Sequence, residues 1–101
     1  NSSAKVGKHC IINTASTLGH DSVMADFSSL ASGVTVAGST RIGICSAICL
    51  RAILIQNIVI GDYTVIGAGS LVLKSVGDLK QFPEFVDHDI SHQMMTKNLL
   101  K

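Results

Sequence analysis

The sequence predicts an all-β fold, a parallel β-helix of six-residue repeats that ends in a short helical tail. Two observations carry this prediction: a large aliphatic residue recurs every six positions, and its neighbours are mostly small. The aromatic content of 4% leaves Val, Ile, Leu and Ala to fill the core. The aliphatic residue keeps its register without a break at Val6, Ile12, Leu18, Met24, Leu30, Val36, Ile42, Ile48, Leu54, Ile60, Ile66 and Val72.

Each repeat is long enough for one short strand and one corner. The residue after the aliphatic is mostly Gly, Ala, Asn or Cys, and the residue two before it is mostly Ser, Thr, Ala or Cys. Such small residues let the backbone turn tightly. Three repeats would close a triangular coil of 18 residues, so we expect residues 4–77 to form about four stacked coils. An ordinary β-sandwich with coincidental spacing is the alternative.

Residues 78–101 depart from the six-residue register and are expected to form a C-terminal tail. Pro83 ends the regular region, and Asp87 or Asp89 could cap a helix that runs to about Leu100. We expect this tail to cover the open end of the coil stack, where strand edges would otherwise be unpaired.

No metal site is expected. His88 and His92 stand four apart and could share one helical face, but a metal site would need further ligands at matching positions. His9 is expected to be a surface residue.

Composition excludes several classes of partner. The net charge of +1 gives no footprint for nucleic acid or for an anionic membrane surface, and no stretch is suited to a transmembrane helix. The three cysteines have no CxxC spacing, which fits reduced thiols in a cytoplasmic protein. Charged residues are only 15% of the chain, so we expect part of its surface to be buried in an oligomer.

The repeat resembles that of the hexapeptide-repeat acyltransferases, whose fold is the left-handed parallel β-helix; the resemblance covers residues 4–77. Residues 11–15 (IINTA), 20–21 (HD) and 25–27 (ADF) are similar to the sialic acid O-acetyltransferases and the bacterial nucleotide-amino-sugar N-acetyltransferases. Those enzymes are homotrimers that bind acetyl-CoA between neighbouring prisms, and the resemblance implies both properties here. They usually carry an N-terminal sugar-binding domain that is absent from this sequence, so we expect a piece of a longer or processed protein.

His20 is the predicted catalytic residue. It lies two positions after Leu18, with Gly19 between them, so it should face outward near a corner. Acetyl transfer from a thioester needs a general base for the incoming amine or hydroxyl, and an imidazole can take up that proton at neutral pH. Asp21, or a backbone carbonyl, could hold the other ring nitrogen and fix the tautomer.

Gly38 is a predicted contact of the acetyl donor. It lies 18 residues after His20 and should therefore stack on it one coil further along. A glycine leaves the backbone N–H open to an oxyanion, and the resemblance places an acetyl-CoA contact at this position. The column continues with Gln56 and Lys74, and Lys74 is a candidate for the phosphates of CoA.

Ser29 marks a departure from the family pattern. Nucleotide-amino-sugar N-acetyltransferases often have a second histidine here, which helps to hold the acetyl donor. A serine hydroxyl can still form a hydrogen bond but cannot carry charge. We assign Ser29 to donor binding, and the identity of the acceptor stays open.

The sequence therefore predicts an acetyl-CoA-dependent acetyltransferase that acts on an amino or hydroxyl group of a bacterial sugar or nucleotide sugar. One alternative is an acyltransferase of the same fold with a non-sugar acceptor, such as an amino acid or antibiotic. A second is a metal-dependent hydratase like the β-helical carbonic anhydrases, which need three converging histidines where the repeats offer only His9 and His20. A third is a non-catalytic β-helix used as an assembly scaffold.

Overall fold

The computed structural model describes residues 3–83, which form strands and turns without a helix. This part of the chain therefore has no helix that could cross a membrane. Every strand is two residues long. In chain order the strands are β1 (Lys5–Val6), β2 (Ile11–Ile12), β3 (Thr17–Leu18), β4 (Val23–Met24), β5 (Ser29–Leu30), β6 (Thr35–Val36), β7 (Arg41–Ile42), β8 (Ala47–Ile48), β9 (Ile53–Leu54), β10 (Val59–Ile60), β11 (Val65–Ile66), β12 (Leu71–Val72) and β13 (Gln81–Phe82).

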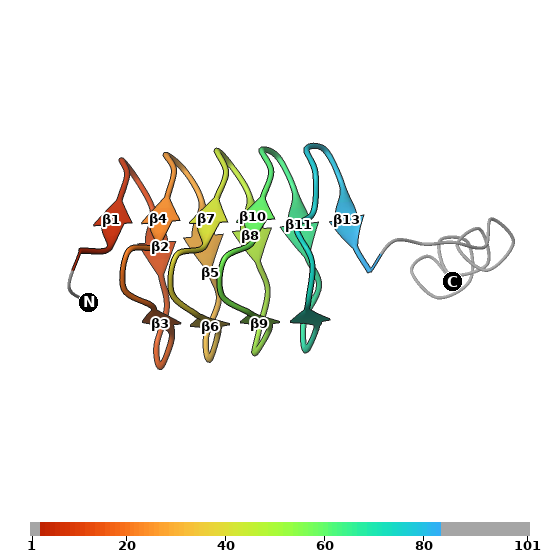
Figure 1. Ribbon diagram of the computed structural model, residues 1–101, viewed down its shortest axis with the longest axis horizontal. Helices are drawn as coiled ribbons and strands as arrows, with labels where there is room; N and C mark the ends of the chain where they lie inside the picture. The colour runs from red at the N-terminus through yellow and green to blue at the C-terminus, as the bar shows by residue number, and fades with distance from the viewer. Residues whose placement is uncertain (1–2, 84–101) are drawn as a thin grey trace, which may run out of the picture.

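The strands form three parallel sheets, one on each side of a triangular prism (Figure 1). Sheet A has the order β1-β4-β7-β10, sheet B the order β13-β11-β8-β5-β2, and sheet C the order β12-β9-β6-β3. Paired residues in the regular coils are 18 positions apart, as in Lys5↔Val23 and Val23↔Arg41. The structure confirms the predicted left-handed parallel β-helix of about four coils.

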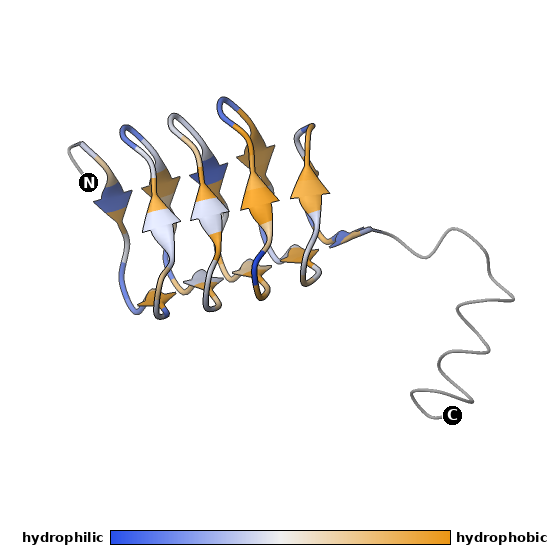
Figure 2. Cartoon of the chain, turned by 90° about the horizontal axis from the view of Figure 1, so that it is seen from below, coloured by the Kyte–Doolittle hydropathy of each residue, from blue (hydrophilic) through white to orange (hydrophobic). Residues whose placement is uncertain are grey.

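The aliphatic residue of each repeat points into the prism, and Figure 2 shows the hydrophobic residues that recur along the strands. Burying each such side chain contributes about 1.5–3 kcal/mol. The fully buried members are Met24, Leu30, Val36, Ile42, Ile48, Leu54, Ile60, Ile66 and Val72. In the first coil, Val6 and Ile12 stay 48% and 44% exposed, because no described coil covers that end of the prism.

Buried hydroxyl groups at the corners link successive coils. Ser22 Oγ donates to the carbonyl of Ala37 (2.9 Å) and accepts the N–H of Thr40 (3.1 Å). Ser46 repeats this pattern one and a third coils later, where its Oγ accepts the N–H of Thr64 (2.9 Å). These bonds satisfy the polar groups that the tight corners bury.

The corners form three edges that differ in chemistry, and every corner except the one after β12 contains a residue with positive φ. On the A–B edge, between sheets A and B, these residues are His9, Phe27, Cys45, Tyr63 and Leu79. On the B–C edge they are Ala15, Gly33, Arg51 and Gly69, and on the C–A edge they are Ser3, Asp21, Ser39 and Asn57. The positive-φ residues of the C–A edge are therefore all polar, and Asp and Asn are among the residues that adopt positive φ most readily.

The last coil is shorter than the others, and the β-helix continues past residue 77, where the tail was predicted to begin. Strand β13 pairs with β11 in the register Val65↔Gln81, a separation of 16 residues instead of 18. The coil therefore reaches Phe82. The predicted tail helix, with His88 and His92, lies outside the described residues.

Candidate functional site

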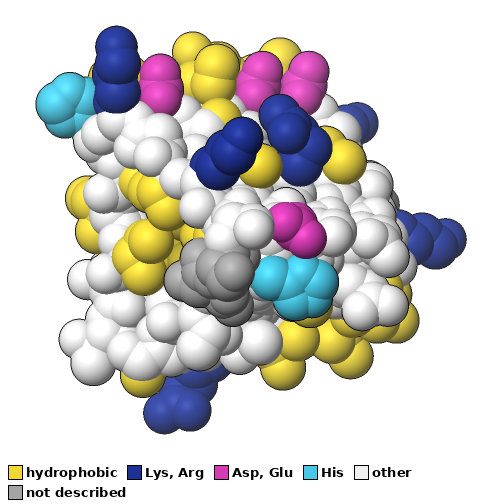
Figure 3. Space-filling view, turned by 60° about the vertical axis from the view of Figure 1, so that its left-hand side comes forward, with side chains coloured by type: hydrophobic (Ala, Val, Ile, Leu, Met, Phe, Trp, Pro, Cys, Tyr) yellow, Lys and Arg dark blue, Asp and Glu magenta, His cyan; other side chains and the backbone are white. Residues whose placement is uncertain are grey.

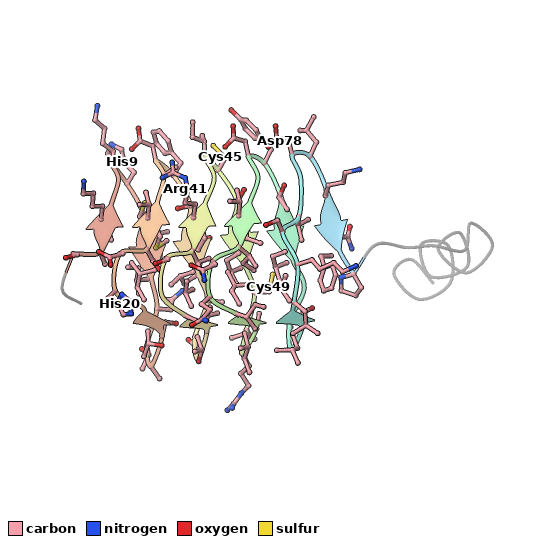
Figure 4. The ribbon with its side chains drawn as sticks, in the orientation of Figure 1. His9, His20, Arg41, Cys45, Cys49 and Asp78 are labelled. Atoms are coloured by element: carbon pink, nitrogen blue, oxygen red, sulfur yellow. The ribbon has the colours of Figure 1, made fainter. Side chains whose placement is uncertain are left out.

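His20 lies on the C–A edge, in the corner that joins β3 to β4. Its Nδ1 lies 3.2 Å from Oδ2 of Asp21, and the two side chains are 70% and 60% exposed. Figure 4 shows His20 on the side of the prism away from His9, Cys45 and Asp78. An exposed pair of this kind adds little to stability. Its effect is to orient the imidazole while leaving the ring open to solvent and ligands.

The ring of His20 covers Gly38, one coil further along. A Cβ at residue 38 would lie 2.9 Å from Nε2 and 3.0 Å from Cε1 of His20. Only glycine therefore leaves room for the ring in this position. Gly19 has a related role, because a Cβ there would lie 2.5 Å from the backbone nitrogen of Gly38. The two glycines let the two corners stack closely.

The backbone keeps the predicted stacking over three coils of the C–A edge. The N–H of Ser39 donates to the carbonyl of His20 (2.9 Å), and the N–H of Asn57 donates to the carbonyl of Gly38 (3.1 Å). The N–H of Gly38 itself donates no hydrogen bond to any part of the chain that the structure describes. An unused donor therefore lies beside the exposed imidazole.

The hydrogen bond to Asp21 favours one tautomer of the His20 imidazole. When Nδ1 carries the proton and donates it to the carboxylate, Nε2 holds a free lone pair. That nitrogen is on the Gly38 side of the ring. The arrangement provides a base, a group that orients the base, and an N–H donor close to the base.

Ser29 is not part of this cluster. It is the outward residue of β5 in sheet B, which is the side of the prism opposite the C–A edge. There it lines an open, mostly apolar groove of about 400 Å³ together with Ile11, Asn13, Cys49 and Leu50. Within one chain, Ser29 and His20 therefore lie on opposite sides of the prism.

Lys74 lies on the C–A edge but beyond its regular part. The corner after β12 is the one that loses two residues, and Ser75 Oγ there accepts the N–H of Val59 (2.8 Å) in place of a backbone carbonyl. Lys74 borders a hollow of about 260 Å³ with Lys80 at the C-terminal end of the prism. The separation of paired residues is 18 at Val72↔Leu54 and 16 at Val76↔Ile60, so the register changes within the corner that contains Lys74.

The remaining candidates do not form a metal site. Within residues 3–83 no group of three His, Cys, Asp or Glu side chains is placed to hold a metal ion. His9 lies on the A–B edge, exposed, with its ring stacked on Phe27 at a centroid distance of 5.2 Å.

Comparison with solved structures relates the chain to acetyltransferases, as the sequence resemblance predicted. A His-to-Ala mutant of GDP-perosamine N-acetyl transferase from Caulobacter crescentus, in complex with CoA and GDP-perosamine, superposes with a TM-score of 0.76 and 26% identity over 77% of this chain and 37% of that chain. Neisseria gonorrhoeae serine acetyltransferase gives a TM-score of 0.74 and 29% identity over 78% of this chain and 34% of that chain.

A third similar structure supports the fold alone. It is the acetyltransferase domain of PglB from Neisseria gonorrhoeae in complex with acetyl coenzyme A, with a TM-score of 0.69 and 24% identity over 79% of this chain and 49% of that chain. The chain thus spans less than half of the length of each of these proteins. No model of a known protein family matches the sequence.

Proposed function

We propose that this chain is the catalytic β-helix of an acetyltransferase that uses acetyl-CoA and acetylates an amino or hydroxyl group of a sugar or nucleotide sugar. The observation that carries the proposal is the exposed His20, hydrogen-bonded to Asp21 and lying over Gly38. Similarity to a GDP-perosamine N-acetyl transferase in complex with CoA supports the donor.

His20 would act as the general base. Nε2 removes the proton from the acceptor amine or hydroxyl as its nitrogen or oxygen bonds to the thioester carbonyl carbon. Asp21 stabilises the imidazolium that forms and keeps the proton on Nδ1. Collapse of the tetrahedral intermediate breaks the carbon–sulfur bond, and the proton on Nε2 passes to the departing CoA sulfur. The products are the acetylated acceptor and CoA with a free thiol.

Gly38 would stabilise the intermediate through its unused N–H. The carbonyl oxygen of the thioester gains negative charge as the acceptor adds, and a fixed donor at this point lowers the barrier. The absence of a Cβ at residue 38 makes room for the His20 ring, and the N–H of the same residue forms no hydrogen bond within the described part of the chain.

The groove on sheet B supports a homotrimer. Its residues lie opposite the C–A edge, so a ring of three chains could seat the His20 edge of one prism against the Ser29 groove of the next. Ser29 would then contact the donor of the neighbouring chain, and Lys74 would lie near the CoA phosphates. Three free cysteines fit a reducing cytoplasm.

A second candidate is an acetyltransferase with an amino acid acceptor. The observation that favours it is the 29% identity to a serine acetyltransferase, which is no lower than the identity to the perosamine enzymes. The chemistry at His20 would be the same, because a serine hydroxyl also needs a base. Only the acceptor would differ.

A thiol-release assay tests the proposal. The full-length protein is incubated with acetyl-CoA and, separately, with nucleotide amino sugars, sialic acid and serine. The proposal expects CoA release that depends on a sugar acceptor, whereas release with serine alone would favour the second candidate. No release with any acceptor, together with no binding of acetyl-CoA, would support a scaffold.

A further inference from the structure

Among the strand residues that point outward, charged side chains occur in sheet A alone. The first residue of each strand points outward, and only two of these residues in the described strands carry a charge, Lys5 and Arg41. Both lie in sheet A and both are exposed. The outward residues of sheets B and C are apolar or uncharged polar: Ile11, Ser29, Ala47, Val65, Gln81, Thr17, Thr35, Ile53 and Leu71.

These two cations flank the strand that leaves the His20 corner. The chain runs from His20 and Asp21 directly into β4, whose Val23 pairs with Lys5 on one side and with Arg41 on the other. With strands about 4.8 Å apart, the two Cα atoms are separated by roughly 10 Å. Two long side chains at that spacing can reach one ligand that lies across β4.

Neither cation is neutralised in the structure. In the described part of the chain no carboxylate lies within 4.0 Å of Lys5 or Arg41, and the pair of His20 with Asp21 is the one contact of this kind. Asp62 and Asp78 border a hollow on sheet A together with Arg41. Their Oδ1 atoms, however, accept the N–H groups of Ile44 and Asp62, each at 2.8 Å, and this fixes both carboxylates at the A–B edge.

Figure 3 shows the resulting surface, on which basic side chains lie between a row of acidic side chains and a histidine with an acidic neighbour. The acidic row is on the A–B edge, so an anion on this face would be repelled from that edge and attracted to Lys5 and Arg41 in sheet A. The C–A edge is the one that carries His20.

We infer that Lys5 and Arg41 bind an oxyanion of the acceptor, a phosphate or carboxylate, and hold the acceptor across sheet A with its nucleophile at His20. The inference rests on the proposed function and specifies its acceptor as a negatively charged molecule. An Arg side chain binds either group through two parallel hydrogen bonds, and Lys adds a second positive charge.

The test is a steady-state comparison of the wild-type protein with Arg41→Gln and Lys5→Gln. Acceptors are a nucleotide diphospho-amino-sugar, sialic acid, and a neutral amino sugar. We expect each variant to raise KM for the anionic acceptors by roughly tenfold to a hundredfold, and to leave KM for acetyl-CoA and for the neutral sugar within about twofold. The acceptor whose KM rises identifies the source of the oxyanion.

Lys8→Gln is the matched control, since it removes the same charge from an exposed side chain on the A–B edge, away from His20. It should leave every KM unchanged. Salt should raise the KM of the wild-type protein for the anionic acceptor and have less effect in Arg41→Gln. An unchanged acceptor KM in both variants, or a rise in the KM for acetyl-CoA alone, would overturn the inference. Turnover that still depends on His20 would show that the proposed function survives.

Discussion

The imidazole of His20 lies so close to Gly38 that a Cβ at residue 38 would come within 2.9 Å of Nε2. The base and the unused backbone N–H are therefore brought together by the stacking of two coils. Asp21 then fixes the orientation of the ring from within the same corner. Each of the three residues has a distinct expected effect when it is changed.

Gly38→Ala should lower turnover while leaving the fold intact. The φ of residue 38 is not positive and so suits alanine, but the added Cβ would lie 2.9 Å from Nε2 of His20, whose ring must move, and 3.2 Å from the His20 carbonyl oxygen, which needs only a small shift. We expect kcat to fall by roughly tenfold to a hundredfold, because a base that is displaced by a fraction of an ångström works poorly. Steady-state kinetics and thermal melting measure the two effects. Gly77→Ala is the control, since its Cβ would meet only Lys80 Cε at 4.0 Å.

Asp21→Asn should lower kcat by roughly tenfold or more without affecting stability. Asn is readily accommodated at the φ of 59° found here. Its side chain, however, removes the charge that stabilises the imidazolium and no longer enforces the required tautomer. The pH–rate profile and the melting temperature should be measured together. An unchanged kcat would mean that another group orients His20.

Gly43→Ala should destabilise the protein without a specific effect on catalysis. A Cβ at residue 43 would collide with the carbonyl of Gly61 and with Oδ1 of Asp62, the atom that accepts the N–H of Ile44. Backbone atoms cannot move aside as a flexible side chain can, so we expect a loss of roughly 2–4 kcal/mol. Chemical denaturation measures it, again with Gly77→Ala for comparison. Equal stability of the two variants would contradict this account.

The six-residue period predicted a parallel β-helix, and the family resemblance predicted that it is left-handed. A coil with one inward-pointing side chain per repeat buries every large aliphatic residue of such a series. The 18-residue coil also predicts which residues stack on each other, as His20 and Gly38 do. Their proximity could therefore be predicted from a count of 18. The hydrogen bond to Asp21 could not, because it depends on the rotamers of two exposed side chains.

Two features of the site needed the structure. Ser29 lies nine residues, or half a coil, after His20, and half a coil leads to the opposite side of the prism. The family resemblance had assigned both residues to the site, and it carried no information on which side of the prism each one lies. Lys74 lies in the corner after β12, which has lost two residues, and the unbroken aliphatic series that ends at Val72 does not reveal this change. The available signal was that Val76 and Phe82 are six residues apart but come two positions earlier than the series ending at Val72 would place them.

Sequence reasoning also missed Lys5 and Arg41. The residue before each aliphatic points outward, so a charge at that position is a surface feature of one particular sheet. A comparison of the outward-pointing residues of the three sheets would have shown that only sheet A carries charged ones. Single charged residues, taken one at a time, gave no such indication.

The turnover of His20→Ala tests the central claim most directly. The variant should be compared with wild-type protein in the thiol-release assay at saturating acetyl-CoA and acceptor, after circular dichroism and sedimentation show that fold and assembly are unchanged. We expect kcat to fall at least about a hundredfold, the usual scale for loss of a general base. A kcat within a few-fold of the wild-type value would contradict the assignment of His20 as the base.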